Sequence, residues 1–353
     1  MATKIKVSII GGAGYGAAEI LRNLLVRDDV VLLRVSSKDH VGKELGDVHK
    51  TLAGYTTLKL EDLPPREAAA GADVVFLGMP HKVTAKVALD LFDLPCKIID
   101  LSGDFRLKSL VDYERDYAPG HPCPERLGTF VYGLPELFRE QIKLARYLAS
   151  PGCFATCVAV GLLPLAQAGL LTGANVRTVA MTGSSGSGQN PQEGTHHPIR
   201  HNNLKPYKVL SHQHRSEILQ TLASSGAARV SLDLVPVSAP LSRGILAISQ
   251  LDLPEGHTRE SIHALYTKRF AGERLLRVLP LGQVPEVVSV AGTARLEMGV
   301  ETRIDEVTGK RTLCVMSAID NLIKGGAGQA VQSFNLMSGG DEYRGLDVPG
   351  LWP

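Results

Sequence analysis

The segment from Lys6 to Glu19, Lys-Val-Ser-Ile-Ile-Gly-Gly-Ala-Gly-Tyr-Gly-Ala-Ala-Glu, decides the fold of this chain. An apolar strand over residues 6–10 runs straight into a glycine turn, and an amphipathic helix follows to about Val26. In this order a glycine pattern is typical of a dinucleotide-binding βα unit, in which the helix N-terminus holds the phosphates. A purely structural turn is the alternative, and a second apolar strand over residues 30–35 favours dinucleotide binding.

The residues of this turn predict how a dinucleotide would be held. Gly11 allows the tight turn, and Gly14 lets the backbone approach a pyrophosphate. Ala17 takes the place of the third glycine, where the helix packs against the strand. We therefore expect the cofactor phosphates to lie against Gly11, Gly14, Tyr15, Gly16 and Ala17.

The second strand ends in Ser36, Ser37 and Lys38, and these residues predict which cofactor is preferred. An NAD site usually offers an acidic residue here, whereas hydroxyls and a cation suit a 2′-phosphate. We therefore expect NADP. Arg34 is either a further phosphate ligand or a solvated strand residue, and Asp39 is a nearby acid that argues for NAD.

Strands and helices continue to alternate through the first half. Residues 73–80 and 97–102 indicate buried parallel strands, with a helix over residues 81–92 between them. Ligands bind outside the carboxyl ends of such strands, so we place Pro80 and Ser102 at the cofactor.

Arg106 ends the sequence Asp-Leu-Ser-Gly-Asp-Phe-Arg, which begins at Asp100. Its place after a strand suits an anionic group, and a loop salt bridge with Asp104 is the alternative. Residues 111–127, rich in Tyr, Pro and charge, indicate a surface excursion with no specific chemistry.

Cys153 follows a strand over residues 146–149 and a Ser-Pro-Gly turn, and an apolar helical run over residues 157–168 comes after it. The cysteine should therefore sit at a helix N-terminus, where the dipole favours an anion and hence the nucleophilic thiolate. The alternative is a buried structural cysteine.

Further polar candidates lie beyond this helix. A strand over residues 176–181 leads into a Gly-Ser-rich loop over residues 182–188, which is either a binding loop or a linker. Residues 196–208 are densely polar and indicate another binding loop. His212, His214 and Glu217 then open a helix, and they suit a base with an orienting carboxylate or, alternatively, a solvated helix start.

The rest of the chain shifts toward strands, which predicts a second domain. We expect strands over residues 230–238, 244–253, 288–300 and 311–318, a helix over 258–270, and a hairpin turn at Thr308-Gly309. A last helix, opening over residues 319–328, should return to the first domain. The predicted fold is α/β: a Rossmann-type dinucleotide-binding domain (residues 1–152 and 319–353) plus an α+β domain with a large, mostly antiparallel sheet (residues 153–318).

Composition excludes several classes of partner. The 353 residues are 21% charged and 44% hydrophobic with a net charge of +2, which gives no electrostatic case for nucleic acid or an anionic membrane. Five cysteines without a paired framework indicate free thiols in a reducing cytoplasm. Cys153 and Cys157 lack a second ligand pair, so we expect no metal. The start of the chain leads directly into a strand, and we expect no signal peptide.

Taken together, these motifs resemble the N-acetyl-gamma-glutamyl-phosphate reductase family, within the wider aspartate-semialdehyde dehydrogenase group. The resemblance covers nearly the whole chain. It rests on the glycine turn, the motif from Asp100 to Arg106, Pro151-Gly152-Cys153-x-x-Thr156, the Gly-Ser-rich loop, His212-x-His214-x-x-Glu217 and Asp320-Asn321-Leu322-x-Lys324-Gly325.

This resemblance implies an NADPH-dependent reduction of N-acetyl-gamma-glutamyl phosphate in arginine biosynthesis. The Cys153 thiolate would displace phosphate to form a thioester, and hydride transfer would release N-acetylglutamate semialdehyde. His212 would be the acid/base, Glu217 would orient it, and Arg106 would hold the substrate's carboxylate or phosphate. The resemblance further implies substrate contacts from His214, His197 and Tyr207, and cofactor contacts from Ser184, Gly186 and Asn321.

Two departures keep the substrate open. The usual His-Arg-His is His212-Gln213-His214, and His196-His197-Pro198 is closer to a sister branch in lysine or arginine synthesis. That branch reduces an aminoadipate or glutamate phosphate on a small acidic carrier protein. Its carrier would contact Arg200, Lys205 and Lys208, which otherwise form a solvated cationic face. An NADP-sensing regulator without catalysis is a further alternative. The family also implies a homodimer or homotetramer.

Overall fold

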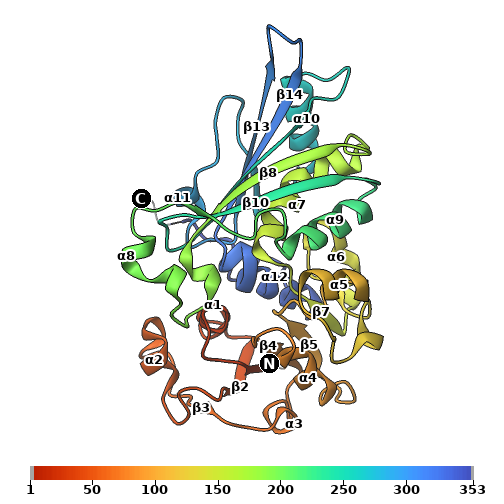
Figure 1. The fold of residues 1–353 in the computed structure, drawn as a ribbon. Coiled ribbons are helices and arrows are strands. Elements are labelled where there is room, and N and C mark those ends of the chain that lie inside the picture. Colours follow the sequence, from red (N-terminus) through yellow and green to blue (C-terminus); the bar gives the residue numbers. More distant parts are fainter. Residues whose placement is uncertain (1–3, 351–353) are drawn as a thin grey trace. The chain divides into compact units, whose positions relative to one another are not determined.

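A computed structural model describes residues 4–350 as two compact units (Figure 1). Of the described residues, the first unit comprises 4–151 and 326–346, and the second comprises 152–325 and 347–350. Residues 1–3, which we expected to lead into the first strand, and residues 351–353 at the end of the predicted first domain lie outside the described residues. None of the described helices is both long and apolar enough to cross a membrane.

The first unit contains a parallel sheet of seven strands in the order β3-β2-β1-β4-β5-β7-β6. Its central strands are buried on both faces, which explains their unbroken apolar sequences. The predicted dinucleotide-binding architecture is therefore confirmed. The strands are β1 (Ile5–Ile10), β2 (Val30–Ser36), β3 (Leu60–Glu61), β4 (Val74–Leu77), β5 (Lys97–Asp100), β6 (Val131–Tyr132) and β7 (Tyr147–Ala149).

Helices connect these strands, as parallel pairing requires. The last helix of the chain also belongs to this unit, and a π-helical turn, Ile323–Ala327, precedes it. The helices are α1 (Tyr15–Leu24), α2 (Leu45–Val48), α3 (Pro65–Ala68), α4 (Val83–Leu89), α5 (Leu110–Asp116), α6 (Pro135–Leu144) and α12 (Gly328–Met337), with 3-10 turns at Lys50–Leu52 and Pro124–Arg126.

The stretch over residues 111–127 is more ordered than we expected. It includes most of α5, and the fully buried Tyr113 donates a hydrogen bond from its hydroxyl to Asp104 Oδ1 at 2.9 Å. His121 is also buried, and its Nε2 lies 2.8 Å from the Asp104 carbonyl oxygen. Most of the segment lies at the surface as we expected, but these buried aromatic residues anchor it around Asp104.

The second unit contains a mixed sheet of seven strands in the order β12-β13-β14-β11-β8-β10-β9. The β8–β10 and β12–β13 pairs are parallel and the others antiparallel, so the prediction of a large, mostly antiparallel sheet is confirmed. The strands are β8 (Asn175–Thr182), β9 (Lys205–Pro206), β10 (Ser231–Ser238), β11 (Ile245–Asp252), β12 (Leu276–Val278), β13 (Leu296–Ile304) and β14 (Arg311–Ile319).

Helices α7 (Cys153–Gln167), α9 (His214–Ser224) and α10 (Arg259–Arg269) pack against strands of this sheet (Figure 1). On the opposite face Val179, Ile248 and Met316 are neighbours across three strands, and Val179 is 42% exposed. The strand expected over residues 288–300 begins only at Leu296. A short helix, α11 (Val287–Val290), precedes it, because Val287 packs against Gly244 and Val290 is buried.

Candidate active site

The glycine turn of the first unit is held by one carbonyl oxygen. The NH groups of Gly11 and Gly12 both donate to Ser36 O, at 2.8 and 2.9 Å. Gly11 has a φ of +93°, and a Cβ there would lie 2.7 Å from the backbone of Gly78. Only glycine fits this position without strain, which is the role that the tight turn predicts for it.

The residues that follow present a row of hydrogen-bond donors. Within the part of the chain that the structure describes, the NH groups of residues 13–17 have no hydrogen-bond partner. A Cβ at Gly14 would meet no atom within 4 Å, and Tyr15 is 41% exposed. Consecutive donors at the start of α1, with open space in front of them, fit the pyrophosphate of a dinucleotide.

The end of β2 differs in detail from the predicted phosphate site. Ser36 is buried, and its carbonyl holds the turn, whereas Lys38 is exposed. The Ser37 hydroxyl accepts a hydrogen bond from Asp39 NH at 3.1 Å. Arg34 is directed elsewhere, because its Nη1 donates to Ala70 O at 2.8 Å. The exposed groups at this strand end are thus Lys38 and Asp39.

A buried polar network joins the ends of β4 and β5. The Ser102 hydroxyl donates a hydrogen bond to Asp100 Oδ2. The same hydroxyl oxygen, Ser102 Oγ, accepts a hydrogen bond from the Asp104 NH. Asp104 in turn accepts the NH groups of Lys82 and Ala85, both at 2.9 Å, and so holds the turn after the exposed Pro80. Burial raises the pKa of Asp100 to about 7, although the Ser102 hydrogen bonds oppose the rise.

Arg106 fastens two strand ends of the first unit. Its Nε donates to Ser150 O at 2.7 Å and its Nη2 to Leu101 O at 2.8 Å, and the residue is 8% exposed. Nη1 lies 3.4 Å from the Tyr117 hydroxyl. The guanidinium is therefore fixed in one orientation, and its partner Ser150 stands three residues before Cys153 in the sequence.

In the second unit, Cys153 is the first residue of α7, as its sequence context predicts. The helix begins four residues earlier than the apolar pattern indicated, and Gly152 is its N-cap in an extended conformation. The thiol is partly exposed, whereas Cys157 one turn later is buried, and this burial raises the pKa of Cys157 to about 12. Cys153 therefore has the position and access of a nucleophile, and Cys157 is structural.

Close packing surrounds the cysteine. A Cβ at Gly325 would lie only 2.7 Å from Cys153 Cβ, and a Cβ at Gly152 would lie 2.4 Å from the His214 ring. Both glycines therefore make room for the Cys153 and His214 side chains. Sequence reasoning missed Gly325 in this role, although its motif was recognised.

Glu217 links the cysteine turn to the histidines. It is fully buried, its Oε2 accepts the Gly152 NH at 2.9 Å, and its Oε1 lies 3.8 Å from His214 Nε2. The carboxylate thus joins the turn before Cys153 to the start of α9. The sequence predicted that Glu217 orients His212, whereas the histidine nitrogen that lies near its carboxylate in the structure is His214 Nε2.

His212 lies in an aromatic enclosure. Its ring contacts Phe154, His214 and Tyr207 edge-on, with centroids 5.1, 4.7 and 5.9 Å away. Burial, reinforced by the charge of His214, lowers the pKa of His212 to about 2. The imidazole is therefore neutral at physiological pH. Phe154 gave no signal in the sequence beyond its place after Cys153.

The side chains of the polar loop over residues 196–208 lie in different environments. Burial and the Cys153 charge raise the pKa of Tyr207, which keeps its hydroxyl protonated as a donor. His197 is exposed and stacks on His201. Arg200 is tied to the sheet through Ser238 Oγ, Ala239 O and Thr182 O, so it does not form part of a solvated cationic face.

The Gly-Ser-rich loop is docked onto the segment before β11. The NH groups of Gly183, Ser184 and Ser185 donate to main-chain oxygens of residues 241–244, and Gly186 is exposed. Asn321 completes the attachment, because its Oδ1 accepts Gly244 NH at 2.7 Å and its Nδ2 donates to Ser185 Oγ at 3.1 Å. These bonds fix the Asn321 amide.

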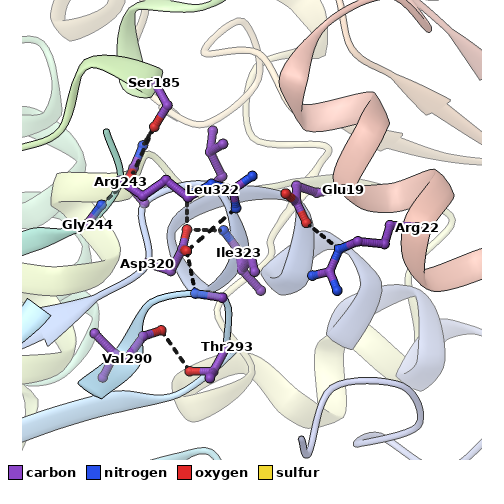
Figure 2. A network of polar contacts seen from close by, with 12 residues as sticks. Glu19, Arg22, Ser185, Arg243, Gly244, Val290, Thr293, Asp320, Leu322 and Ile323 are labelled. Carbon is purple, nitrogen blue, oxygen red and sulfur yellow. Dashed lines mark hydrogen bonds and ion pairs between the residues drawn. The ribbon is translucent and has the colours of Figure 1, made fainter. Parts of the chain in front are cut away.

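Asp320 precedes Asn321, and Figure 2 shows its carboxylate beside Leu322 and Ile323. Its carboxylate accepts the NH groups of Leu322 and Ile323, and its Oδ2 lies 3.6 Å from Arg243 Nη1. Gly325 NH donates to the Asp320 carbonyl at 2.9 Å. Asp320 therefore determines where both Asn321 and Gly325 lie.

Comparison with known proteins matches both halves of the chain. Residues 6–145 match the family described as semialdehyde dehydrogenase, NAD binding domain, and residues 153–321 match semialdehyde dehydrogenase, dimerisation domain. A putative LysW-L-2-aminoadipate 6-phosphate reductase of Thermomicrobium roseum is 41% identical, over 99% of both chains. An N-acetyl-gamma-glutamyl-phosphate reductase of Moorella thermoacetica is 37% identical, over 99% of this chain and 100% of its own.

Solved structures share the fold at low identity. Aspartate semialdehyde dehydrogenase II of Vibrio cholerae superposes with a TM-score of 0.73 at 15% identity, over 96% of this chain and 99% of its own. The Candida albicans aspartate semialdehyde dehydrogenase, solved with NADP, gives 0.68 at 13% identity, over 95% and 98%. A glycine turn with free donors, a cysteine that begins a helix and full-length relatives above 30% identity show together that this chain is an NAD(P)-binding reductase of the semialdehyde dehydrogenase family.

Proposed function

We propose that the protein reduces N-acetyl-gamma-glutamyl phosphate to N-acetylglutamate semialdehyde with NADPH, a reaction of arginine biosynthesis. The observation that carries the proposal is the position of Cys153 at the start of α7, where Glu217 binds the adjoining Gly152 NH. The His214 ring packs on Gly152, and the His212 ring packs on His214 and on Phe154, the residue after the cysteine. Six relatives at 36–38% identity carry the name of this reductase.

The chain's own residues supply acid/base and nucleophilic chemistry. Neutral His212 accepts the Cys153 proton, and the sulfur attacks the acyl carbon. A C–S bond forms, the bond between the acyl carbon and the bridging phosphate oxygen breaks, and phosphate leaves with that electron pair. When NADPH is bound, it supplies the hydride that reduces the thioester carbonyl. The C–S bond then breaks, and His212 returns its proton to the sulfur as the semialdehyde departs.

Other residues bind and orient. We assign the pyrophosphate to the turn from Gly11 to Ala17, because the NH groups of residues 13–17 are unpaired. Lys38 and the Ser37 hydroxyl are the groups that favour NADP over NAD. Pro80, Ser102, Ser184, Gly186 and Asn321 remain the proposed further cofactor contacts. Arg106, Tyr207, His197 and His214 remain the candidates for holding the substrate.

The reverse reaction tests this proposal. Purified protein receives NADP, inorganic phosphate and N-acetylglutamate semialdehyde, and NADPH absorbance is followed. We expect phosphate-dependent NADPH formation that is lost in Cys153→Ser, while the variant still binds NADPH. A Cys153→Ser variant with turnover would refute the thioester route. A wild type that binds NADPH, turns nothing over and responds to a partner would support a regulator instead.

A carrier-bound substrate is the second candidate. It is favoured by the 41% identical relative named for LysW-aminoadipate phosphate and by the exposed Lys205. Lys208 is less suited, because its Nζ donates to Gln213 Oε1 at 2.8 Å. Purified acidic carrier protein loaded with aminoadipate semialdehyde, in place of the free substrate, distinguishes the two: whichever substrate gives the higher kcat/KM identifies the branch.

We further propose that the second unit forms a homodimer through the open face of its sheet, on its own or within a homotetramer. The match to a dimerisation domain supports this surface, as do the exposed Val179 and its half-buried neighbours Ile248 and Met316. The five cysteines are free thiols, which suits the reducing cytoplasm in which we place the enzyme. Sedimentation of Val179→Glu against wild type tests the interface, and an unchanged mass would exclude this face.

A further inference from the structure

A buried histidine outside every recognised motif contacts the glycine turn. His49, 8% exposed, lies with its Nε2 2.8 Å from the carbonyl oxygen of Gly12, 37 residues away in the sequence. A carbonyl oxygen can only accept a hydrogen bond, so Nε2 must carry the hydrogen. The neutral tautomer with its hydrogen on Nε2 and the imidazolium both make this hydrogen bond.

This bond completes the restraint of Gly12. The NH of Gly12 donates to Ser36 O at 2.9 Å, and its carbonyl accepts from His49 at 2.8 Å. The peptide unit between Gly12 and Ala13 is planar and trans, so its C=O and its NH point in opposite directions. Holding the Gly12 oxygen toward His49 therefore turns the Ala13 NH away from it, at the start of the row of unpaired donors over residues 13–17.

The segment that carries His49 is itself fixed. The His49 NH donates to Leu45 O and its carbonyl accepts Leu52 NH, both at 2.8 Å. Leu45 and Leu52 are both buried, and Gly46 packs so closely against Ala53 that a Cβ would lie 2.7 Å from its Cα. The imidazole is thus held by a rigid turn on one side and by the Gly12 oxygen on the other.

We propose that His49 is a positioning residue for dinucleotide binding: its Nε2–H holds the Gly12 carbonyl so that the following NH groups face the pyrophosphate. This rests on nucleotide binding by the first unit. The bond contributes to affinity by pre-organising the turn, because a turn already held in its binding conformation loses less entropy on association.

The test compares dissociation constants for NADPH and NADH, measured by fluorescence titration, among matched variants. His49→Gln keeps an N–H donor the same number of bonds from the main chain, whereas His49→Asn is one carbon shorter and His49→Leu has no donor. We expect about a tenfold weaker Kd in the Leu and Asn variants for the preferred nucleotide, from the usual worth of one hydrogen bond, and a Kd near wild type for Gln. The reaction rate of Cys153 with iodoacetamide should stay unchanged.

His263→Leu is the matched control. His263 Nε2 also contacts a main-chain oxygen, that of Leu279 at 2.9 Å, but in the second unit. It should lower the melting temperature and leave nucleotide affinity unchanged. Wild-type affinity in His49→Asn, equal losses in Asn and Gln, or an equal loss in His263→Leu would each overturn the positioning role. A wild type that binds neither nucleotide would overturn the proposed function as well.

Discussion

Replacing Gly325 with alanine tests the geometry of the cysteine directly. An alanine Cβ would lie 2.7 Å from Cys153 Cβ, 3.0 Å from Ile319 Cδ1 and 3.1 Å from Cys153 Cα. Carbon atoms pack at about 3.5–4.0 Å, so the cysteine and the new methyl group must separate by about 1 Å. The position of Gly325 is fixed by its NH bond to Asp320 O, so we expect Cys153 to move.

The consequences follow from the size of that shift. A displacement of about 1 Å at a reacting atom lowers the rate about 100-fold. Overpacking lowers the free energy of unfolding by about 1–3 kcal/mol. The higher helix propensity of alanine over glycine offsets up to about 1 kcal/mol of that loss. We therefore expect a folded variant with a slightly lower melting temperature, about 100-fold lower kcat and unchanged NADPH affinity.

Gly194→Ala provides the control, because a Cβ there meets no atom within 4 Å and its φ is not in the left-handed region. The assays are kcat in the reverse reaction, the rate at which iodoacetamide alkylates Cys153, and thermal denaturation. If Gly325→Ala turned over within twofold of wild type, the close packing at Cys153 would have no catalytic role, and the reasoning would fail.

Three further outcomes are expected. Glu217→Gln replaces a charge-assisted hydrogen bond to the Gly152 NH by a neutral one and removes a buried carboxylate 3.8 Å from His214 Nε2. We expect kcat to fall at least about tenfold, with NADPH affinity retained. An unchanged kcat would contradict the role of the carboxylate. The lowered pKa of His212 contributes stability that is complete above pH 6.5 and is lost as the pH falls toward 2, whereas the raised pKa of Asp100 contributes stability that is complete below pH 3.8 and is lost as the pH rises to 7. Between pH 6.5 and 5, each group changes the free energy of unfolding by at most about 1.4 kcal/mol per pH unit. In urea unfolding, His212→Gln should therefore gain stability relative to wild type as the pH falls, and Asp100→Asn should lose stability relative to wild type. Equal pH profiles of the free energy of unfolding in all three proteins would disprove both expectations. Asn321→Leu leaves the buried Gly244 NH without its acceptor and should cost about 1–3 kcal/mol, with faster hydrogen exchange at Ser185; exchange at the wild-type rate would show that Asn321 does not hold the loop.

Local signals in the sequence predicted the elements that carry the chemistry. The strand, glycine turn and helix over residues 6–24 have the periodicity and glycine spacing of a dinucleotide-binding unit, and both the parallel sheet and the turn are present. The Ser-Pro-Gly turn likewise predicted Cys153 at a helix N-terminus. These predictions succeed because each depends on residues within about one turn of helix or strand.

Predictions failed where distant residues override local preference. The β-branched run at Val287–Val290 is helical because it packs against Gly244, and Tyr113 lies inward because Asp104 accepts its hydroxyl. We expected Arg200 at a carrier contact or on a solvated cationic face, yet main-chain oxygens of two strand ends hold it. No local pattern reports such contacts.

The sequence by itself determined that this chain has a dinucleotide turn and a cysteine at a helix start, and it predicted a base nearby. Only the tertiary structure decided how these groups are held. It showed that Glu217 holds Gly152, that Gly325 makes room for Cys153, and that His49 holds Gly12. The physical reason is range: helix, strand and turn preferences act between neighbours, whereas orientation at a site is set by packing and hydrogen bonds between residues far apart in the chain.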